Sequence, residues 1–353
     1  MRLISESEKN SLLFENWQQE NKNKLRTYQI HENYVDLQPG TGLNLSSLHS
    51  DKLDVSLSKI HPYASNNIPL KGKLLILRFQ FDWNYGHVLH DLLPLIALLD
   101  ESSAAEKIAV LATPMLKSLV KAHRTRFNKV LFFEPKQIKT FIASAYFIFD
   151  FDLMTERNTK MSANYKRILD SNINSFYRPP TQNLLIYCSR NSSSDVHHNR
   201  TMKTSIENKI IKTLKAFALK NRLDFLVFNG QENGKTMSHE KQIRIFRRAK
   251  VAIGPHGSAM ANIIYMDPRN SPVVCEFCSG PDNIVHGKGP FKKNYNFLNS
   301  FAIDTTYAYF IILFDNLSSN AITSIRMPDF RKFLRCLKAF LGNQNLSDAH
   351  QNR

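Results

Sequence analysis

The chain is 353 residues long, which is the length of two average domains or of one large one. Hydrophobic residues make up 42% of it and charged residues 22%, so it can bury a sizeable core, and wholesale disorder is excluded. Lysine and arginine (47) outnumber aspartate and glutamate (30), and the resulting net charge of +17 should attract polyanions.

The N-terminal region, residues 1–70, is polar and only weakly periodic. It lacks the apolar segment of a secretory signal, and no part of the chain has the ~18–20 apolar residues that a membrane-spanning helix needs. As the sequence stands, we expect a cytoplasmic or peripheral membrane protein. The alternative is a protein of the endoplasmic reticulum or Golgi lumen, if the sequence begins downstream of a eukaryotic membrane anchor.

Residues 71–179 alternate between expected strands and expected helices. The strands are 73–79, 108–113, 129–134 and 141–152, and the helices are 87–99 and 114–124. Such alternation is typical of βαβ units around a mostly parallel sheet. We interpret this region as a Rossmann-like domain.

A second alternating region, 180–325, begins at Pro179 and Pro180, which interrupt both helix and sheet. Its expected strands are 183–190, 224–229, 250–254 and 271–277, and its expected helices are 206–221, 240–249 and 258–266. The sequence therefore predicts an α/β protein with two Rossmann-like domains.

The last segment, 326–353, predicts an amphipathic helix. Its apolar face is formed by Phe330, Phe333, Leu334, Leu337, Phe340 and Leu341, and its basic residues lie elsewhere on the helix. A basic helix lying on an anionic membrane would have this pattern. A terminal helix docked onto its own protein would have it too, and we favour this second interpretation.

The stretch NYGHVLHDLLP directly follows an expected strand and contains Asn84, His87, His90, Asp91 and Pro94. If a helix begins near Asn84, then His87 and Asp91 share one face, because they are four residues apart. A carboxylate beside an imidazole at a strand-to-helix junction is a plausible acid–base site. The structural alternative is that Asn84 caps the helix and the other two residues are merely paired.

The stretch VAIGPHGSAMANIIYM runs from an expected strand through Gly254, His256, Gly257 and Ser258 into an expected helix. Glycines permit a tight turn and the close approach of a ligand. Unpaired N–H groups at a helix N-terminus favour a phosphate or diphosphate, and His256 can donate a hydrogen bond to a phosphoryl oxygen. The alternative is an ordinary glycine-rich turn.

Two arginines precede that turn. Arg190 ends the expected strand 183–190, and Arg200 follows shortly after. Open α/β sheets bind ligands at the carboxyl ends of their strands, and arginine suits bidentate phosphate contact. The alternative is solvated charge on a basic chain.

Other patterns give no metal site. Cys275 and Cys278 form a C-x-x-C without a second pair, and they lie in or just after an expected strand, so we interpret them as structural. The pair His197-His198 has no partner cluster.

These motifs together resemble glycosyltransferase family 61. The family element N-x-x-H-x-x-x-D-x-x-P is matched by Asn84, His87, Asp91 and Pro94. The later signature block is matched by Gln242, Ile243, Ala249, Val251, residues 253–258 and Asn262. Its closing acidic residue is matched by Glu276, and its arginine-rich stretch by Arg190 and Arg200. Where the family often has Asn-Glu, this chain has Thr204-Ser205, with Glu207 beyond.

The resemblance implies the glycosyltransferase B architecture, in which two Rossmann-like domains face a cleft. It also implies an inverting, metal-independent enzyme without a cofactor, whose co-substrate is a nucleotide sugar, expected to be a UDP-sugar. The acceptor would be a hydroxyl of a glycan or glycoprotein, and no nucleic-acid partner is expected.

The resemblance also implies roles for single residues. Asp91 would deprotonate the acceptor, with His87 and His90 as alternative bases. The diphosphate would be held by Arg190, Arg200, Gly254, His256, Gly257 and Ser258. Glu276 would hold ribose or donor hydroxyls, and Asn84, Gln242 and Asn262 would support the site.

Three other functions fit part of the sequence. The net charge suits a polyanion or nucleic-acid binder, but the charge is spread and no recognised binding motif is present. A catalytically inactive homologue would retain the same motifs. A hydrolase could use the His–Asp pair, but it would lack an obvious nucleophile.

Overall fold

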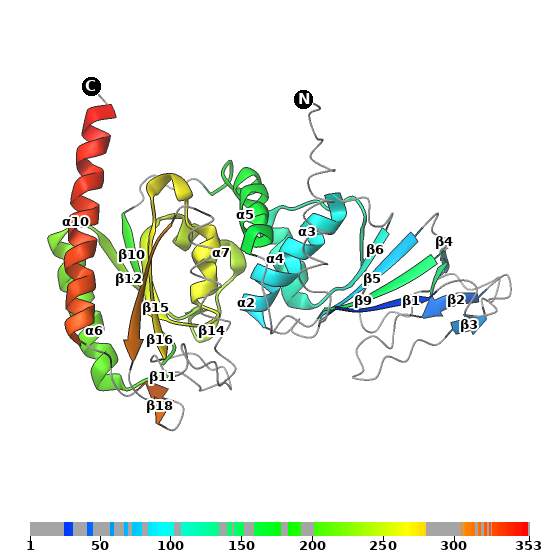
Figure 1. The fold of residues 1–353 in the computed structure, drawn as a ribbon, viewed down its shortest axis with the longest axis horizontal. Coiled ribbons are helices and arrows are strands. Elements are labelled where there is room, and N and C mark those ends of the chain that lie inside the picture. The colour runs from blue at the N-terminus through cyan, green and yellow to red at the C-terminus, as the bar shows by residue number, and fades with distance from the viewer. Residues whose placement is uncertain are drawn as a thin grey trace. The chain divides into compact units, whose positions relative to one another are not determined.

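The computed structural model describes residues 25–30, 41–44, 57–59, 67–69, 73–79, 84–101, 107–133, 140–142, 145–151, 159–177, 183–191, 201–279, 305, 307–314, 317–318, 321–322, 325 and 327–351. The chain divides into two compact units, Met1–Tyr165 and Lys166–Arg353 (Figure 1). The division lies within one helix, α5 (Thr159–Ile173), ahead of the proline pair at which the sequence analysis places a boundary.

The first unit is built on a five-stranded sheet in the order β1-β9-β5-β6-β7. The strands are β1 (Leu25–Ile30), β5 (Lys73–Phe79), β6 (Lys107–Leu111), β7 (Val130–Phe133) and β9 (Ala145–Phe151). All neighbouring pairs are parallel except the edge pair β1–β9. The expected strands therefore form a mostly parallel sheet, as their alternation with helices predicted. The expectation of a single strand over 141–152 is wrong, because Ala145–Phe151 belongs to this sheet whereas Thr140–Ile142 pairs in another one.

The N-terminal region contains strands that its weak periodicity did not indicate. Besides β1, it contributes to a four-stranded sheet in the order β3-β2-β8-β4. These strands are β2 (Thr41–Asn44), β3 (Leu57–Lys59), β4 (Asn67–Pro69) and β8 (Thr140–Ile142).

The expected helix over 87–99 is present, but it is not uniformly α-helical. It consists of α2 (Tyr85–His87), the π-helical turn η2 (Val88–Leu92) and α3 (Leu93–Glu101). Pro94 has no N–H for the carbonyl of His90, and its ring would clash with that carbonyl in a regular α-helix. The wider π turn immediately before the proline accommodates this conflict. The expected helix over 114–124 is α4 (Pro114–His123).

The second unit is built on an entirely parallel five-stranded sheet in the order β12-β10-β15-β16-β17. The strands are β10 (Leu184–Cys188), β12 (Asp224–Phe228), β15 (Ala249–Pro255), β16 (Val273–Ser279) and β17 (Ala308–Phe314). The first four are those expected from the alternation with helices, and the fifth coincides with the apolar run 307–314, whose composition favours a buried strand. Short pairings add β11 (Thr201–Met202) with β18 (Leu317–Ser318) and β19 (Ala321–Ile322), and β13 (Gln231–Glu232) with β14 (Lys235–Thr236).

Helices cover both faces of this sheet. On one face lie α6 (Thr204–Lys220) and α10 (Met327–Gln351) (Figure 1). Both contribute to a single buried cluster with alternate residues of the strands. On the other face, Phe228 of β12 packs edge-on against Phe246 of α7 (His239–Arg247). The mixed α/β class predicted from the sequence is therefore confirmed.

The C-terminal helix α10 is docked onto its own protein, as the favoured interpretation predicted. Phe330, Phe333 and Leu337 are buried, Phe330 packs against Phe277 of β16, and Phe333 packs against Phe310 of β17. The apolar face is thus covered by the sheet. Among the helices that the structure describes, none combines the length and the apolar character needed to cross a bilayer.

The expected α-helix over 258–266 is wrong in type. The segment forms a short 3₁₀ helix, η3 (Met260–Tyr265), in which backbone N–H groups bond to carbonyls three residues earlier. It ends at Tyr265, two residues before Asp267, which precedes Pro268 and is therefore disfavoured in helical conformation. A helix this short has only a small dipole at its N-terminus.

Candidate active site

The first candidate region follows the carboxyl end of β5, a central strand of the first sheet. The chain moves from β5 to β6 and β7 on one side, and then returns to β9 on the other. The carboxyl edge between β5 and β9 is therefore a topological switch point, where open α/β sheets bind ligands. Helix α2 begins shortly after this edge, so the NYGHVLHDLLP motif lies close to it in the chain.

In this region the structure pairs His87 with Asp91. The His87 Nδ1 atom lies 2.8 Å from the Asp91 carboxylate, as their spacing predicted. Asn84 caps the helix, its side-chain oxygen accepting hydrogen bonds from the backbone N–H groups of Gly86 and His87. The side chain of His87 is 12% exposed and that of Asp91 only 2%. The imidazole is therefore the more accessible member of the pair.

His90 occupies a different environment from His87. It is 2% exposed, and its Nδ1 atom lies 3.2 Å from the hydroxyl of Ser162 in α5. This buried position favours a structural role over that of an alternative base.

The second candidate region lies at the switch point of the second sheet, between β10 and β15. Arg190 follows β10, and its guanidinium donates a 2.8 Å hydrogen bond to the backbone carbonyl of His256, which follows β15. Gly257 makes this contact feasible. Its φ is +155°, and a Cβ atom there would lie 2.1 Å from the Arg190 Nη1 atom.

The other small residues of the turn differ in role. A Cβ atom at Gly254 would lie 2.6 Å from the carbonyl oxygen of Cys188, so this glycine permits the close approach of β10 and β15. Ser258 is exposed. Of the two glycines, only Gly257 therefore adjoins the cationic part of the site.

His256 is held by a buried carboxylate. Its Nδ1 atom lies 2.5 Å from one oxygen of Glu276, and Tyr309 of β17 donates a hydrogen bond to the other oxygen. Glu276 is fully buried, whereas the His256 side chain is 20% exposed. Both carboxylate oxygens are thus engaged within the protein, which favours an orienting role for Glu276 over direct contact with sugar hydroxyls.

The structure reveals another buried carboxylate, Glu207 of α6, for which the sequence predicted no role. One of its oxygens accepts hydrogen bonds from the hydroxyls of Ser189, at 2.7 Å, and Tyr187, at 3.2 Å. Glu207 therefore fixes the end of β10 immediately before Arg190. The sequence does contain a hint of this role, because Glu207 lies near the position at which the family often has an Asn-Glu pair. Its hydrogen-bond partner Ser189 is 18 residues away, however, and no local pattern connects the two.

Asn191, which follows Arg190, is bonded to the backbone of Met202. Its side chain both accepts a hydrogen bond from the backbone N–H of Met202, at 2.7 Å, and donates one to the backbone carbonyl of Met202, at 2.5 Å. These two bonds hold the segment after β10 against the residues that precede α6. Arg200, the other arginine expected in the site, lies outside the described residues.

The expected supporting residues stabilise the backbone. Gln242 donates a hydrogen bond to the carbonyl of Met237 ahead of α7, and Asn262 donates one to the carbonyl of Ala259, which caps η3. Both are buried. Cys275 is buried too, and burial raises the pKa of its thiol, which agrees with a structural role.

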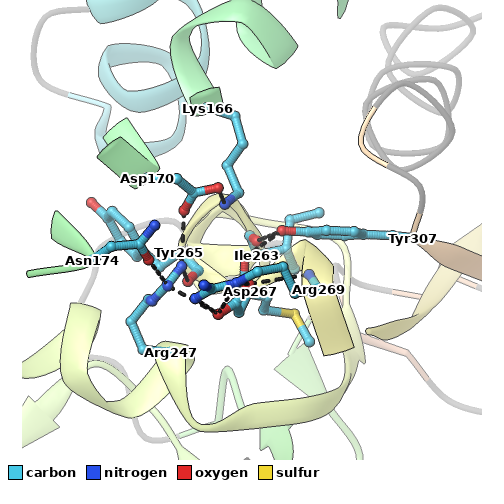
Figure 2. A network of polar contacts seen from close by, with 10 residues as sticks. Lys166, Asp170, Asn174, Arg247, Ile263, Tyr265, Asp267, Arg269 and Tyr307 are labelled. Carbon is cyan, nitrogen blue, oxygen red and sulfur yellow. Dashed lines mark hydrogen bonds and ion pairs between the residues drawn. The ribbon is translucent and has the colours of Figure 1, made fainter. Parts of the chain in front are cut away.

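A buried ion network anchors the segment that follows the candidate site (Figure 2). Arg247 of α7 is fully buried and bridges Asp170 of α5, at 2.8 Å, and Asp267, which lies two residues after η3, at 3.1 Å. Lys166 also pairs with Asp170, and Arg269 pairs with Asp267. The network ties α5, α7 and the segment after η3 together.

Burial and charge shift the pKa values within this network. Burial lowers the pKa of Lys166 to about 8, against the opposing charge of Asp170. Burial raises the pKa of Asp267, but hydrogen bonds from Arg269 and the charge of Arg247 outweigh it, and the resulting pKa is about 2. The carboxylate of Asp267 is therefore ionised at neutral pH.

A comparison with protein families matches residues 85–274 to the model of Glycosyltransferase 61. The matched range contains His87, Asp91, Arg190 and His256, and so includes residues of both candidate regions. A search of the curated proteins found no match.

Proposed function

The chain belongs to glycosyltransferase family 61, and we propose that it is an inverting enzyme that transfers a sugar from a UDP-sugar to a hydroxyl group of a glycan or protein-linked acceptor. The observation that carries the proposal is the set of groups at the carboxyl edge of the second sheet. There, Arg190, His256 and a glycine turn meet at a topological switch point. We include in the proposal the glycosyltransferase B architecture that the family resemblance implies.

In this proposal the second unit binds the diphosphate of the donor. The guanidinium of Arg190 supplies fixed positive charge beside the turn. His256 Nδ1 is engaged by Glu276, so Nε2 is the ring atom through which His256 would contact a phosphoryl oxygen. Backbone N–H groups of Gly257 and Ser258 would add hydrogen bonds. Preorganised donors of this kind stabilise the negative charge that develops on a leaving diphosphate.

The His87–Asp91 pair would serve as the base. The hydroxyl oxygen of the acceptor attacks the sugar C1 atom, and the bond between C1 and the phosphate oxygen breaks on the opposite face. The hydroxyl proton passes to the pair. The greater exposure of His87 supports proton transfer to its Nε2 atom, with Asp91 orienting the ring and stabilising the imidazolium that forms. Direct transfer to Asp91 is the alternative within the same pair.

Replacing His256 by alanine is expected to weaken UDP binding by about 1–3 kcal/mol, the scale of a lost hydrogen bond to a charged group. Isothermal titration calorimetry with purified protein measures this directly. His239→Ala, at the start of α7, is a matched control and should leave UDP affinity unchanged. Equal UDP affinity of the His256 variant and the wild type would remove His256 from the donor site.

The enzyme is expected to remain active in EDTA. In the proposed mechanism Arg190, His256 and backbone N–H groups carry out the charge stabilisation that a divalent ion performs in metal-dependent transferases. The measurement is UDP release from a UDP-sugar with a suitable acceptor, before and after chelation. Loss of activity on chelation, restored by added manganese, would contradict metal independence.

A further inference from the structure

The outer sides of α6 and α10 carry a concentration of positive charge, here called the basic face. It consists of eight exposed side chains: Lys209, Lys212, Lys215, Lys220, Arg331, Lys332, Arg335 and Lys338. Both helices cover the same face of the second sheet (Figure 1), and they bury their apolar sides in one cluster. Their exposed sides therefore belong to one side of the second unit.

Little negative charge offsets the basic face. Among the side chains of these two helices that the structure describes, the acidic ones are Glu207 and Asp329. Glu207 is buried and bonded to Ser189, so it points into the protein, and Asp329 is only partly exposed. Within the described residues, none of the eight cations forms an ion pair. The basic face thus keeps its full charge toward solvent.

We propose that the basic face adsorbs to an anionic membrane surface. Two helices lying over one face of a sheet present a broad surface, which suits the plane of a bilayer. Six of the eight cations are lysines, which attract headgroups through charge alone and need no bidentate geometry. Leu219, beside Lys220, is 82% exposed and is an apolar side chain that could enter the headgroup region.

Membrane adsorption explains the basic face better than the binding of single-stranded nucleic acid does. Single-stranded nucleic acid is bound on exposed aromatic side chains, whereas the phenylalanines of the described part of both helices are buried or partly buried. An isolated amphipathic helix inserts its apolar face into the membrane. Helix α10 cannot bind in that way, because the sheet covers its apolar face. The expected contact is therefore mainly electrostatic and sensitive to salt.

The test is co-sedimentation of the full-length protein with vesicles of phosphatidylcholine containing about one third phosphatidylglycerol, compared with phosphatidylcholine alone. We expect binding only to the anionic vesicles, and its loss at high salt. Each cation close to such a surface strengthens adsorption by about fivefold. Changing the four cations of α10 to glutamine should therefore weaken binding at least tenfold, and so should the same change in α6.

A control variant makes the same change in net charge at four exposed cations elsewhere: Lys117, Lys121, Arg126 and Lys235. We expect it to bind the vesicles within about threefold of the wild type, because the long-range part of the interaction is screened by salt. Thermal unfolding curves of the variants, compared with that of the wild type, check that each variant is folded. Equal losses in all three variants would overturn the proposal, since net charge alone would then explain the binding.

A DNA duplex provides the competing outcome. If the wild type binds the duplex but not the anionic vesicles, and the α6 and α10 variants lose duplex binding, the basic face is a nucleic-acid surface and the membrane proposal is wrong. The vesicle measurement does not depend on UDP binding or turnover, so its result is independent of the proposed function.

Discussion

Replacing Asp91 by asparagine is expected to lower kcat by about 10²–10⁴-fold, the usual contribution of a general base. The substitution is nearly isosteric, but an amide cannot stabilise the imidazolium of His87, whose Nδ1 atom lies 2.8 Å from the carboxylate. The affinity for UDP should stay close to that of the wild type, since Asp91 and the proposed donor residues lie in different units. Turnover and calorimetry on the same preparation measure both quantities.

His87→Gln is expected to produce a loss of similar size. Two residues that act as one unit give non-additive effects, so the kcat of the double variant should be only slightly lower than that of either single variant.

Asp100 provides a control, because it is a buried carboxylate at the end of α3 that accepts hydrogen bonds from the backbone N–H groups of Asn128 and Lys129. Asp100→Asn should reduce stability without reducing kcat. If the kcat of the Asp91→Asn variant is within about threefold of the wild-type value, Asp91 is not part of the catalytic base.

Replacing Arg247 by leucine is expected to destabilise the protein by about 3–5 kcal/mol, the usual cost of removing one partner from a buried ion pair. Asp170 and Asp267 would each lose a charged partner, although Lys166 and Arg269 would still contact them. For a unit of this size the melting temperature should fall by on the order of 10 °C. Urea and thermal unfolding measure the change.

The neighbouring residue is a matched control for this prediction. Arg248 carries the same side chain, but it is 42% exposed and pairs with Asp224, which is 53% exposed. An exposed ion pair contributes about 0–1 kcal/mol, so Arg248→Leu should have little effect on unfolding. Similar destabilisation by the two substitutions would show that the network of Figure 2 does not stabilise the fold as inferred.

The regions with strong periodicity could be predicted from the sequence alone. Short apolar runs predicted the strands of the second sheet. Amphipathic spacing predicted helices α4, α6, α7 and α10. Helix α5 was missed, although Tyr165, Leu169 and Ile173 recur every fourth residue. Its pattern is obscured because Ser162 and Lys166 are buried as well, and their polar groups are satisfied by His90 and Asp170.

In the candidate site, too, the contacts between residues close in sequence could be predicted, whereas the contacts between distant residues could not. Helix geometry alone brings together residues four apart, so the sequence by itself determined the His87–Asp91 pair and the cap at Asn84. Arg190 and the carbonyl of His256 are 66 residues apart, and Glu276 and Tyr309 are 33 apart. Those contacts exist because β10, β15, β16 and β17 are neighbours in one sheet, and strand order is not encoded in local periodicity. Only the tertiary structure decided that Arg247 is buried while the adjacent Arg248 is exposed. The two side chains leave the end of α7 in different directions, and only that of Arg247 reaches the buried network with Asp170 and Asp267.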